Sequence, residues 1–419
     1  MSFKRIPLLI LVLALLLMST TTLIVAQDDP APLLDALALV PDESHGELYF
    51  VDIAAIEEAY PPAHRPIDWE ESLADNGLPY DVWWHMFRNY ILPGLEYFRS
   101  AAEMPAAMGA DFFQIDRVLV DAAPPQTVMY LFGDFDPAAI GAALTERDFT
   151  QEAVSGAVEL WCGSVGCENS EQINLRERNS ADFFGGDLGR QWGRLIAPEF
   201  MIGANIFTDL QDVEQVVNGA QDSLASNLLY QAAVAALSDQ ATLLQAFIPS
   251  DAGLASFSDV GALLAPTLAP EQRRAIFARL LDNHLETLPP FKLALFADVV
   301  SENEEIGSVV LVYALPADAE TAARILPERI AAYQSLVTQR SLSEMLDERQ
   351  VEVRADVLPG EFYTTVRLNF AAPKPTAEAI AEDAPRPLVY RLLLNAFVQR
   401  DMNWLSTLSR ADLEALAGN

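Results

Sequence analysis

The strongest constraint on the fold is an order of predicted elements that occurs twice along the chain. Alternating apolar residues predict strands, and apolar residues at three- and four-residue steps predict helices. Strands are expected in both halves, at 47–53, 112–120, 127–132, 157–162, 172–177, 198–207, 291–300, 307–315, 351–357 and 362–370. A helix is expected after the second strand of each half, opening near Pro137 and Pro316. We therefore predict an α+β fold of two similar modules, each an antiparallel sheet packed against helices.

Local chemistry indicates where helices and turns begin. Asp136 is suited to cap a helix, and Pro137 suits its first position, where no backbone N–H is needed. Thr208 and Gln211 have the spacing of a capping box, which predicts one of several helices between the modules. Pro327 is expected to interrupt or restart the helix of the second half.

These elements divide the chain into four parts. Residues 1–26 resemble an export signal, 27–238 form the first α+β module, and 239–374 form the second. Residues 375–419 are predicted to be a linker and a helical tail. The linker follows from four prolines between positions 371 and 387.

The N-terminus has the pattern of a secretory signal peptide. Lys4 and Arg5 precede an apolar run, and Ala26 precedes a polar, acidic stretch, so we expect cleavage after Ala26. The alternative is an uncleaved N-terminal membrane anchor, because residues 6–26 are just long enough to cross a bilayer. Both interpretations place the body of the protein outside the cytoplasm, secreted or in the cell envelope.

The charge balance excludes one class of partner. The chain carries 26 basic and 60 acidic residues, which gives a net charge of −34. Such a chain repels phosphate backbones, so nucleic-acid binding is not expected. The sequence does not identify which partner the protein binds.

The two cysteines are Cys162 and Cys167, separated by a short loop that contains two glycines. In an exported chain the expected outcome is a structural disulfide. A redox pair normally has two intervening residues instead of four, and no histidine lies nearby in sequence to complete a zinc site.

No sequence motif predicts a catalytic residue, a cofactor or a metal site. The histidines are scattered and match no metal-ligand spacing: His45, His64, His85 and His284. No nucleophile elbow of the G-x-S-x-G type is present. The glycine-rich stretch at 185–189 predicts a turn and not a phosphate cradle, because no lysine is near. With 60 carboxylates, two acids could meet in space in a way that sequence alone does not test.

The densest aromatic cluster lies between Tyr80 and Phe98. Five residues of this segment, three aromatic and two aliphatic, recur at helical steps, which favours a helix packed into the core. Trp83 falls outside this stripe and is therefore the one candidate for an exposed ligand contact.

The run from Gly133 to Ile140, with Ala143 and Leu144 after it, resembles exported bacterial proteins of unknown function that have repeated strand–helix modules. The resemblance covers residues 112–238 and implies no catalytic residues. We expect a non-enzymatic binding or interaction module of the cell envelope or exterior. The alternative is a secreted hydrolase of polysaccharide or peptide that uses paired carboxylates.

Overall fold

The structure is a computed structural model, and it describes residues 32–60, 102–123, 125–238, 242–256, 269–283, 286–376 and 389–417. The predicted signal segment and the aromatic cluster between Tyr80 and Phe98 lie outside the described residues. Among the residues described, no helix is long and apolar enough to cross a bilayer.

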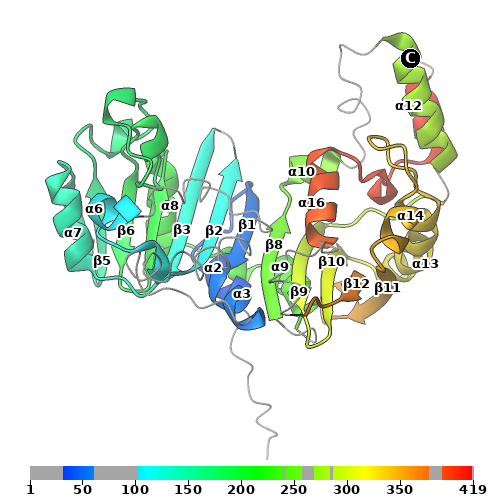
Figure 1. Ribbon diagram of the computed structural model, residues 1–419, viewed down its shortest axis with the longest axis horizontal. Coiled ribbons are helices and arrows are strands. Elements are labelled where there is room, and N and C mark those ends of the chain that lie inside the picture. The colour runs from blue at the N-terminus through cyan, green and yellow to red at the C-terminus, as the bar shows by residue number, and fades with distance from the viewer. Residues whose placement is uncertain are drawn as a thin grey trace, which may run out of the picture.

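One continuous antiparallel sheet of twelve strands extends through the molecule (Figure 1). In chain order the strands are β1 (Glu47–Asp52), β2 (Ile115–Ala123), β3 (Gln126–Gly133), β4 (Thr150–Ser155), β5 (Val158–Cys162), β6 (Gly193–Ala197), β7 (Phe200–Ala204), β8 (Thr242–Ile248), β9 (Leu293–Val300), β10 (Glu304–Tyr313), β11 (Glu352–Pro359) and β12 (Thr364–Pro373). Their spatial order is β11-β12-β10-β9-β8-β1-β2-β3-β7-β6-β5-β4.

The two halves of this sheet have the same strand order. Outward from the centre, one half follows β1-β2-β3-β7-β6 and the other follows β8-β9-β10-β12-β11. The hairpin β4–β5 extends the first half only. β1 and β8 pair antiparallel, with Tyr49 opposite Phe247, so a local two-fold axis passes through this pair. The predicted α+β fold of two similar antiparallel modules is confirmed, and main-chain hydrogen bonds join the modules into one sheet.

One face of the sheet has a separate helical cover over each module. Over the first module, this cover is α3 (Ile53–Ala59), α6 (Met104–Met108) and α7 (Pro137–Glu146). Over the second, it is α13 (Pro316–Ala332), α14 (Leu342–Asp347) and α16 (Val389–Val398). α7 begins as predicted, because Asp136 accepts a hydrogen bond from the backbone N–H of Ala138 at 2.9 Å.

The opposite face carries one apolar layer that extends across both modules. Its cover is α2 (Pro32–Leu37), α8 (Phe207–Val217) and α9 (Leu228–Ala235). α9 belongs to the predicted first module in sequence, yet it packs on β9, β10 and β12 of the second. α12 (Pro270–Asn283) and α17 (Arg410–Ala417) pack against each other away from the sheet (Figure 1).

Several local predictions are wrong for identifiable reasons. Residues 172–177 were expected to form a strand, but Leu175–Glu177 is a 3-10 helix after a side-chain cap by Asn174. α8 begins at Phe207, and its N-cap Ile206 offers no side-chain hydrogen bond, so the predicted capping box is absent. α13 continues through Pro327 without ending there.

The predicted disulfide is confirmed. Cys162 at the end of β5 bonds to Cys167, with their Cα atoms 4.9 Å apart. The predicted turn at 185–189 is a short 3-10 helix, Gly186–Leu188, flanked by Gly185 and Gly189 in the left-handed region at φ +81° and +64°.

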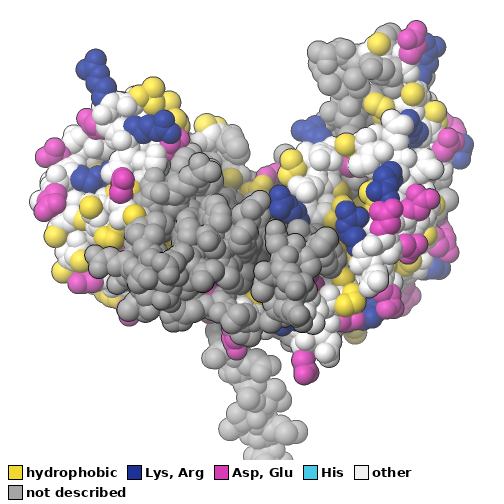
Figure 2. All heavy atoms as spheres, viewed as in Figure 1, with side chains coloured by type: hydrophobic (Ala, Val, Ile, Leu, Met, Phe, Trp, Pro, Cys, Tyr) yellow, Lys and Arg dark blue, Asp and Glu magenta, His cyan; other side chains and the backbone are white. Residues whose placement is uncertain are grey.

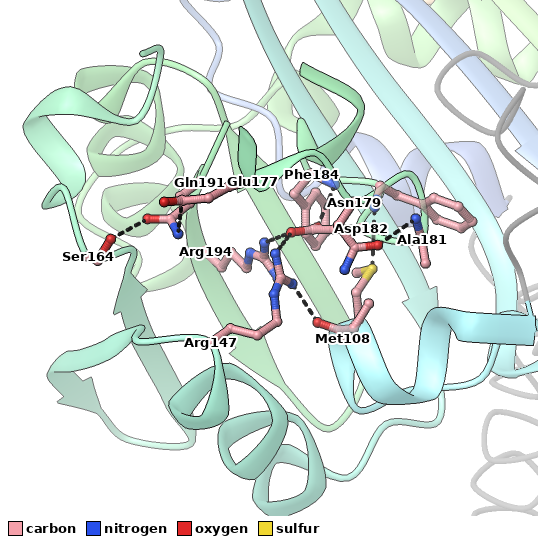
Figure 3. A network of polar contacts seen from close by, with 12 residues as sticks. Met108, Arg147, Ser164, Glu177, Asn179, Ala181, Asp182, Phe184, Gln191 and Arg194 are labelled. Atoms are coloured by element: carbon pink, nitrogen blue, oxygen red, sulfur yellow. Dashed lines mark hydrogen bonds and ion pairs between the residues drawn. The ribbon is translucent and has the colours of Figure 1, made fainter. Parts of the chain in front are cut away.

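A buried ionic network holds the long segment between β5 and β6 against the sheet (Figure 3). Asp182 Oδ2 accepts from Arg194 at 2.6 Å and from Arg147 at 2.7 Å. The Arg194 guanidinium also lies 4.6 Å from the ring centroid of Phe149 and 5.2 Å from that of Phe184. Because removing Asp182 would leave the buried charge of Arg194 unpaired, this network constrains the loop strongly.

The first testable prediction concerns the disulfide. The double variant Cys162→Ala/Cys167→Ala is expected to lose about 2 kcal/mol of unfolding free energy, because a small ring no longer restricts the unfolded chain. Urea unfolding followed by circular dichroism measures this difference. In excess dithiothreitol the variant and the wild-type protein should converge, and a difference that persists there would contradict a cross-link origin.

The second prediction concerns Asp52, which caps α3 by accepting from the backbone N–H of Ala55 at 2.8 Å. Burial raises the pKa of Asp52 to about 6, although Ala55 and Arg117 oppose the shift. The folded state therefore binds a proton more tightly than the unfolded state, and this contribution to stability is lost as pH rises from about 4 to 6. Asn retains the cap without titrating.

We expect Asp52→Asn to gain stability relative to the wild-type protein, by up to about 3 kcal/mol, between pH 4 and pH 7. Urea unfolding at a series of pH values measures this difference. Parallel stability profiles for the two proteins would show that Asp52 titrates alike in the folded and unfolded states.

Candidate functional site

A pocket of about 260 Å³ opens on the face of the first module that α2 and α8 cover. Its walls are the loop at 41–46 and the first turns of α8, and its floor is formed by β2 and β3. The described residues that line it are Pro41, Glu43, Ser44, His45, Gly46, Asp121, Ala123, Gln126, Val128, Tyr130, Asp209, Asp212 and Val213.

Asp121 on β2 is held by the loop at 41–46. Ser44 Oγ donates to Asp121 Oδ2 at 2.5 Å. A Cβ atom on Gly46 would lie 1.7 Å from Asp121 Oδ1, so only glycine leaves room for this carboxyl group. Burial raises the pKa of Asp121; the hydrogen bond from Ser44 opposes this, the charge of Asp209 adds to it, and His45 lowers it.

Asp209 enters the pocket from the first turn of α8. Gln126 Nε2 donates to Asp209 Oδ1 at 3.3 Å. Asp209 Oδ2 is buried and has no hydrogen-bond partner among the described residues. Burial raises the pKa of Asp209, and the neighbouring charge of Asp212 adds to the shift.

Tyr130 on β3 has a hydroxyl group without a partner. The side chain is 0% exposed, and Tyr130 Oη has no hydrogen-bond partner within the described part of the chain. Burial raises the pKa of Tyr130 well above its ordinary value, and the charges of Asp121 and Asp209 add to this. All three side chains line the same pocket. An unsatisfied buried polar group of this kind costs about 1–3 kcal/mol.

In the second module, the sheet positions equivalent to Asp121 and Tyr130 hold apolar side chains that pack in the core. The two-fold axis through Tyr49 and Phe247 relates Leu48 to Ala246, which share one face of the sheet. The cross-strand neighbour of Leu48 is Asp121, and that of Ala246 is Ala297.

The same two-fold axis relates β3 of the first module to β10 of the second. Tyr130 pairs with Leu119, and Val310 pairs with Leu295, so Tyr130 and Val310 occupy equivalent positions. Ala297 and Val310 are buried in the apolar layer under α9. The carboxyl group of Asp121 and the hydroxyl group of Tyr130 are thus features of the first module, and the sheet itself does not require them.

The chemistry that this pocket offers is acceptor-rich and negative. Its described lining contains carboxyl groups and one histidine but no lysine or arginine. Ser44 donates to Asp121 and not to His45, so the arrangement is not that of a serine nucleophile activated by histidine. In the described parts of the chain, no three His, Cys, Asp or Glu residues are grouped closely enough to hold a metal ion.

The sequence pointed to a different residue. Trp83, the predicted ligand contact, lies outside the described residues, as do His64, His85 and His284. His45 lines the pocket. Sequence reasoning missed Asp121 because Pro124 and Pro125 led us to expect a turn from position 121, whereas β2 continues to Ala123.

No protein-family model and no curated protein matches the chain. Among solved structures, the chain is similar to TP0453 in two crystal forms. Crystal form I is 9% identical with a TM-score of 0.32, and the alignment covers 85% of this chain and 97% of that one. Crystal form IV is 8% identical with a TM-score of 0.34, over 84% and 98% of the two chains. Neither likeness is close enough to bear on fold or function.

The third prediction follows from the unpaired hydroxyl group. Tyr130→Phe is expected to raise the unfolding free energy of the ligand-free protein by about 1 kcal/mol, because it removes a buried group without a partner. Chemical denaturation measures the change. Tyr313→Phe is a matched variant, since Tyr313 is also fully buried with an unpaired hydroxyl. A loss of stability in Tyr130→Phe would indicate that its hydroxyl is satisfied in solution.

Proposed function

We propose that this protein is an exported, non-enzymatic binding protein whose ligand site is the acidic pocket of the first module. The single observation that carries the proposal is the pair of buried, unpartnered polar atoms in one pocket, Tyr130 Oη and Asp209 Oδ2. Native proteins rarely leave such atoms unpaired, and a ligand that pairs them recovers free energy on binding. The apolar residues at the equivalent positions of the second module support a role for these groups beyond packing.

The location outside the cytoplasm is part of the same proposal. Its support is the signal-like segment at 1–26, the resemblance of residues 112–238 to exported bacterial proteins, and the disulfide between Cys162 and Cys167. Seen from the side of Figure 1, acidic side chains are scattered over both ends of the molecule among basic and apolar ones (Figure 2). A negative surface of this kind favours solubility.

The second candidate is the secreted hydrolase. Asp121 and Asp209 line one pocket, and the pKa of each carboxyl group is raised. Glycoside cleavage needs one carboxylic acid with a raised pKa as its proton donor. The partner acid in such enzymes is ionised, however, whereas burial raises the pKa of both groups here. Tyr130 is the only aromatic residue in the described lining, and its ring is buried, so no stacking surface for sugars is present there.

The fourth prediction separates these two functions. Thermal unfolding of the purified protein is measured against a panel of cationic, anionic and neutral small molecules, and chromogenic glycosides and peptide nitroanilides are assayed in parallel. We expect one class of molecule to raise the melting temperature, and Asp121→Asn to lose that shift. We expect no turnover in either assay.

Turnover that both Asp121→Asn and Asp209→Asn abolish would replace the proposal with the hydrolase. A panel in which no class raises the melting temperature would remove the pocket as a ligand site. Asp52→Asn serves as the control, because Asp52 is a buried carboxyl group that does not line the pocket.

A further inference from the structure

The unfilled hydrogen-bonding capacity of the pocket defines what a ligand must supply. Tyr130 Oη and Asp209 Oδ2 are both buried without partners in the described structure. A carboxylate accepts only, and a phenol oxygen both donates and accepts. An ammonium group carries three N–H donors and no acceptor, so its donors match in number these two atoms and the Asp121 carboxylate.

The charges around the pocket select the same chemistry. Glu43, Asp121, Asp209 and Asp212 line it, and no basic side chain does so within the described lining. The N-terminus of α8 would attract an anion in a neutral setting, but Asp209 already lies in its first turn and complements the helix dipole. An anionic ligand would therefore meet acidic side chains, and a neutral ligand would leave the partly buried carboxylates without a counter-charge.

A divalent metal ion fits this pocket less well than an organic cation. Calcium takes six to eight oxygen ligands, and in the described residues no three acidic, histidine or cysteine side chains are grouped closely enough to hold a metal. The lining also contains Pro41, Val128 and Val213, whose apolar surface suits a short alkyl chain instead of a hydrated ion.

We propose that the pocket binds a small organic ammonium ion, with the charged nitrogen between Asp121, Asp209 and Tyr130 Oη and a short alkyl body against the apolar wall. This inference rests on the proposed function, because it requires the pocket to be the ligand site. Gly46 and Ser44 act as positioning residues: the first leaves room for Asp121 and the second fixes its Oδ2.

The experiment uses n-butylammonium chloride as the probe, titrated into the purified protein by isothermal calorimetry. n-Butanol, sodium butyrate and calcium chloride are the neutral, anionic and metal arms. About 150 mM NaCl reduces non-specific attraction to a chain of net charge −34. We expect saturable binding of one equivalent of butylammonium with a Kd of about 0.1–1 mM, as suits so small a ligand. The other three arms should show no saturable binding.

Matched variants place the binding in the pocket. Asp121→Asn and Tyr130→Phe should each weaken butylammonium binding at least about tenfold. Asp52→Asn and Tyr313→Phe should leave the Kd unchanged, because neither residue lines the pocket. Gly46→Ala should also weaken binding, since its Cβ displaces the Asp121 carboxyl group. Tyr130→Phe is expected to be at least as stable as the wild-type protein, so its loss of affinity does not depend on unfolding.

The outcomes distinguish this inference from the broader proposal. If butanol, butyrate or calcium binds in place of butylammonium, and Tyr130→Phe abolishes that binding, the pocket is a ligand site but the ammonium assignment is wrong. If butylammonium binds equally to the wild-type protein and to both Asp121→Asn and Tyr130→Phe, the cation is attracted only by the acidic surface and the inference fails. If none of the four compounds binds, and no molecule in the wider panel raises the melting temperature, both the ammonium assignment and the proposed ligand site are wrong.

Discussion

The pairing of β1 with β8 is the interaction on which the rest of the structure depends. Each strand is the innermost of its module, and the hydrogen bonds between them join both modules into one sheet. At the centre of this pair the rings of Tyr49 and Phe247 lie 4.8 Å apart. Neither strand is left as an exposed edge, so the junction offers no open row of backbone groups to another chain. The two modules are therefore oriented by main-chain bonds and not by a soft domain interface.

A continuous sheet also allows one part of the chain to cover the strands of another. α9 follows α8 in sequence but packs on β9, β10 and β12, and Arg367 on β12 donates to the carbonyl oxygen of Ala236 just beyond α9, at 2.7 Å. Over β2 and β3, in contrast, the cover consists of α8 and the loop at 41–46, which leave the pocket between them. The position of the site thus follows from how the helices are distributed over one face of the sheet.

Local chemistry made much of the fold predictable. Asp136 and Pro137 define the start of α7, and the two closely spaced cysteines predicted the disulfide once the N-terminus was interpreted as an export signal. β8 was missed because residues 243–248 are apolar on both faces except for Gln245, so the strand lacks the alternation that marks a half-buried strand. The order of the strands in the sheet was not predictable, because pairing between β1 and β8 joins residues about 200 positions apart.

The pocket was hidden from sequence for a related reason. Ser44 and Asp121 are 77 positions apart, and nothing local to either residue indicates that they meet. Pro124 and Pro125 suggested that Asp121 lay in a solvated turn, where an aspartate needs no explanation. Only the register of β2 with β1 and β3 places its carboxyl group under α8.

The residues around Asp121 are difficult to explain by stability alone. Ala297 and Val310 occupy the equivalent positions of the second module and are buried there without any polar group. In the first module, Gly46 leaves room for a carboxyl group, Ser44 donates to it, and Tyr130 presents a hydroxyl group that nothing in the described structure pairs. The loop at 41–46, β2 and β3 therefore each contribute to one arrangement that lowers the stability of the ligand-free protein. Such agreement at a local energetic cost is typical of functional sites, where stability is given up for recognition.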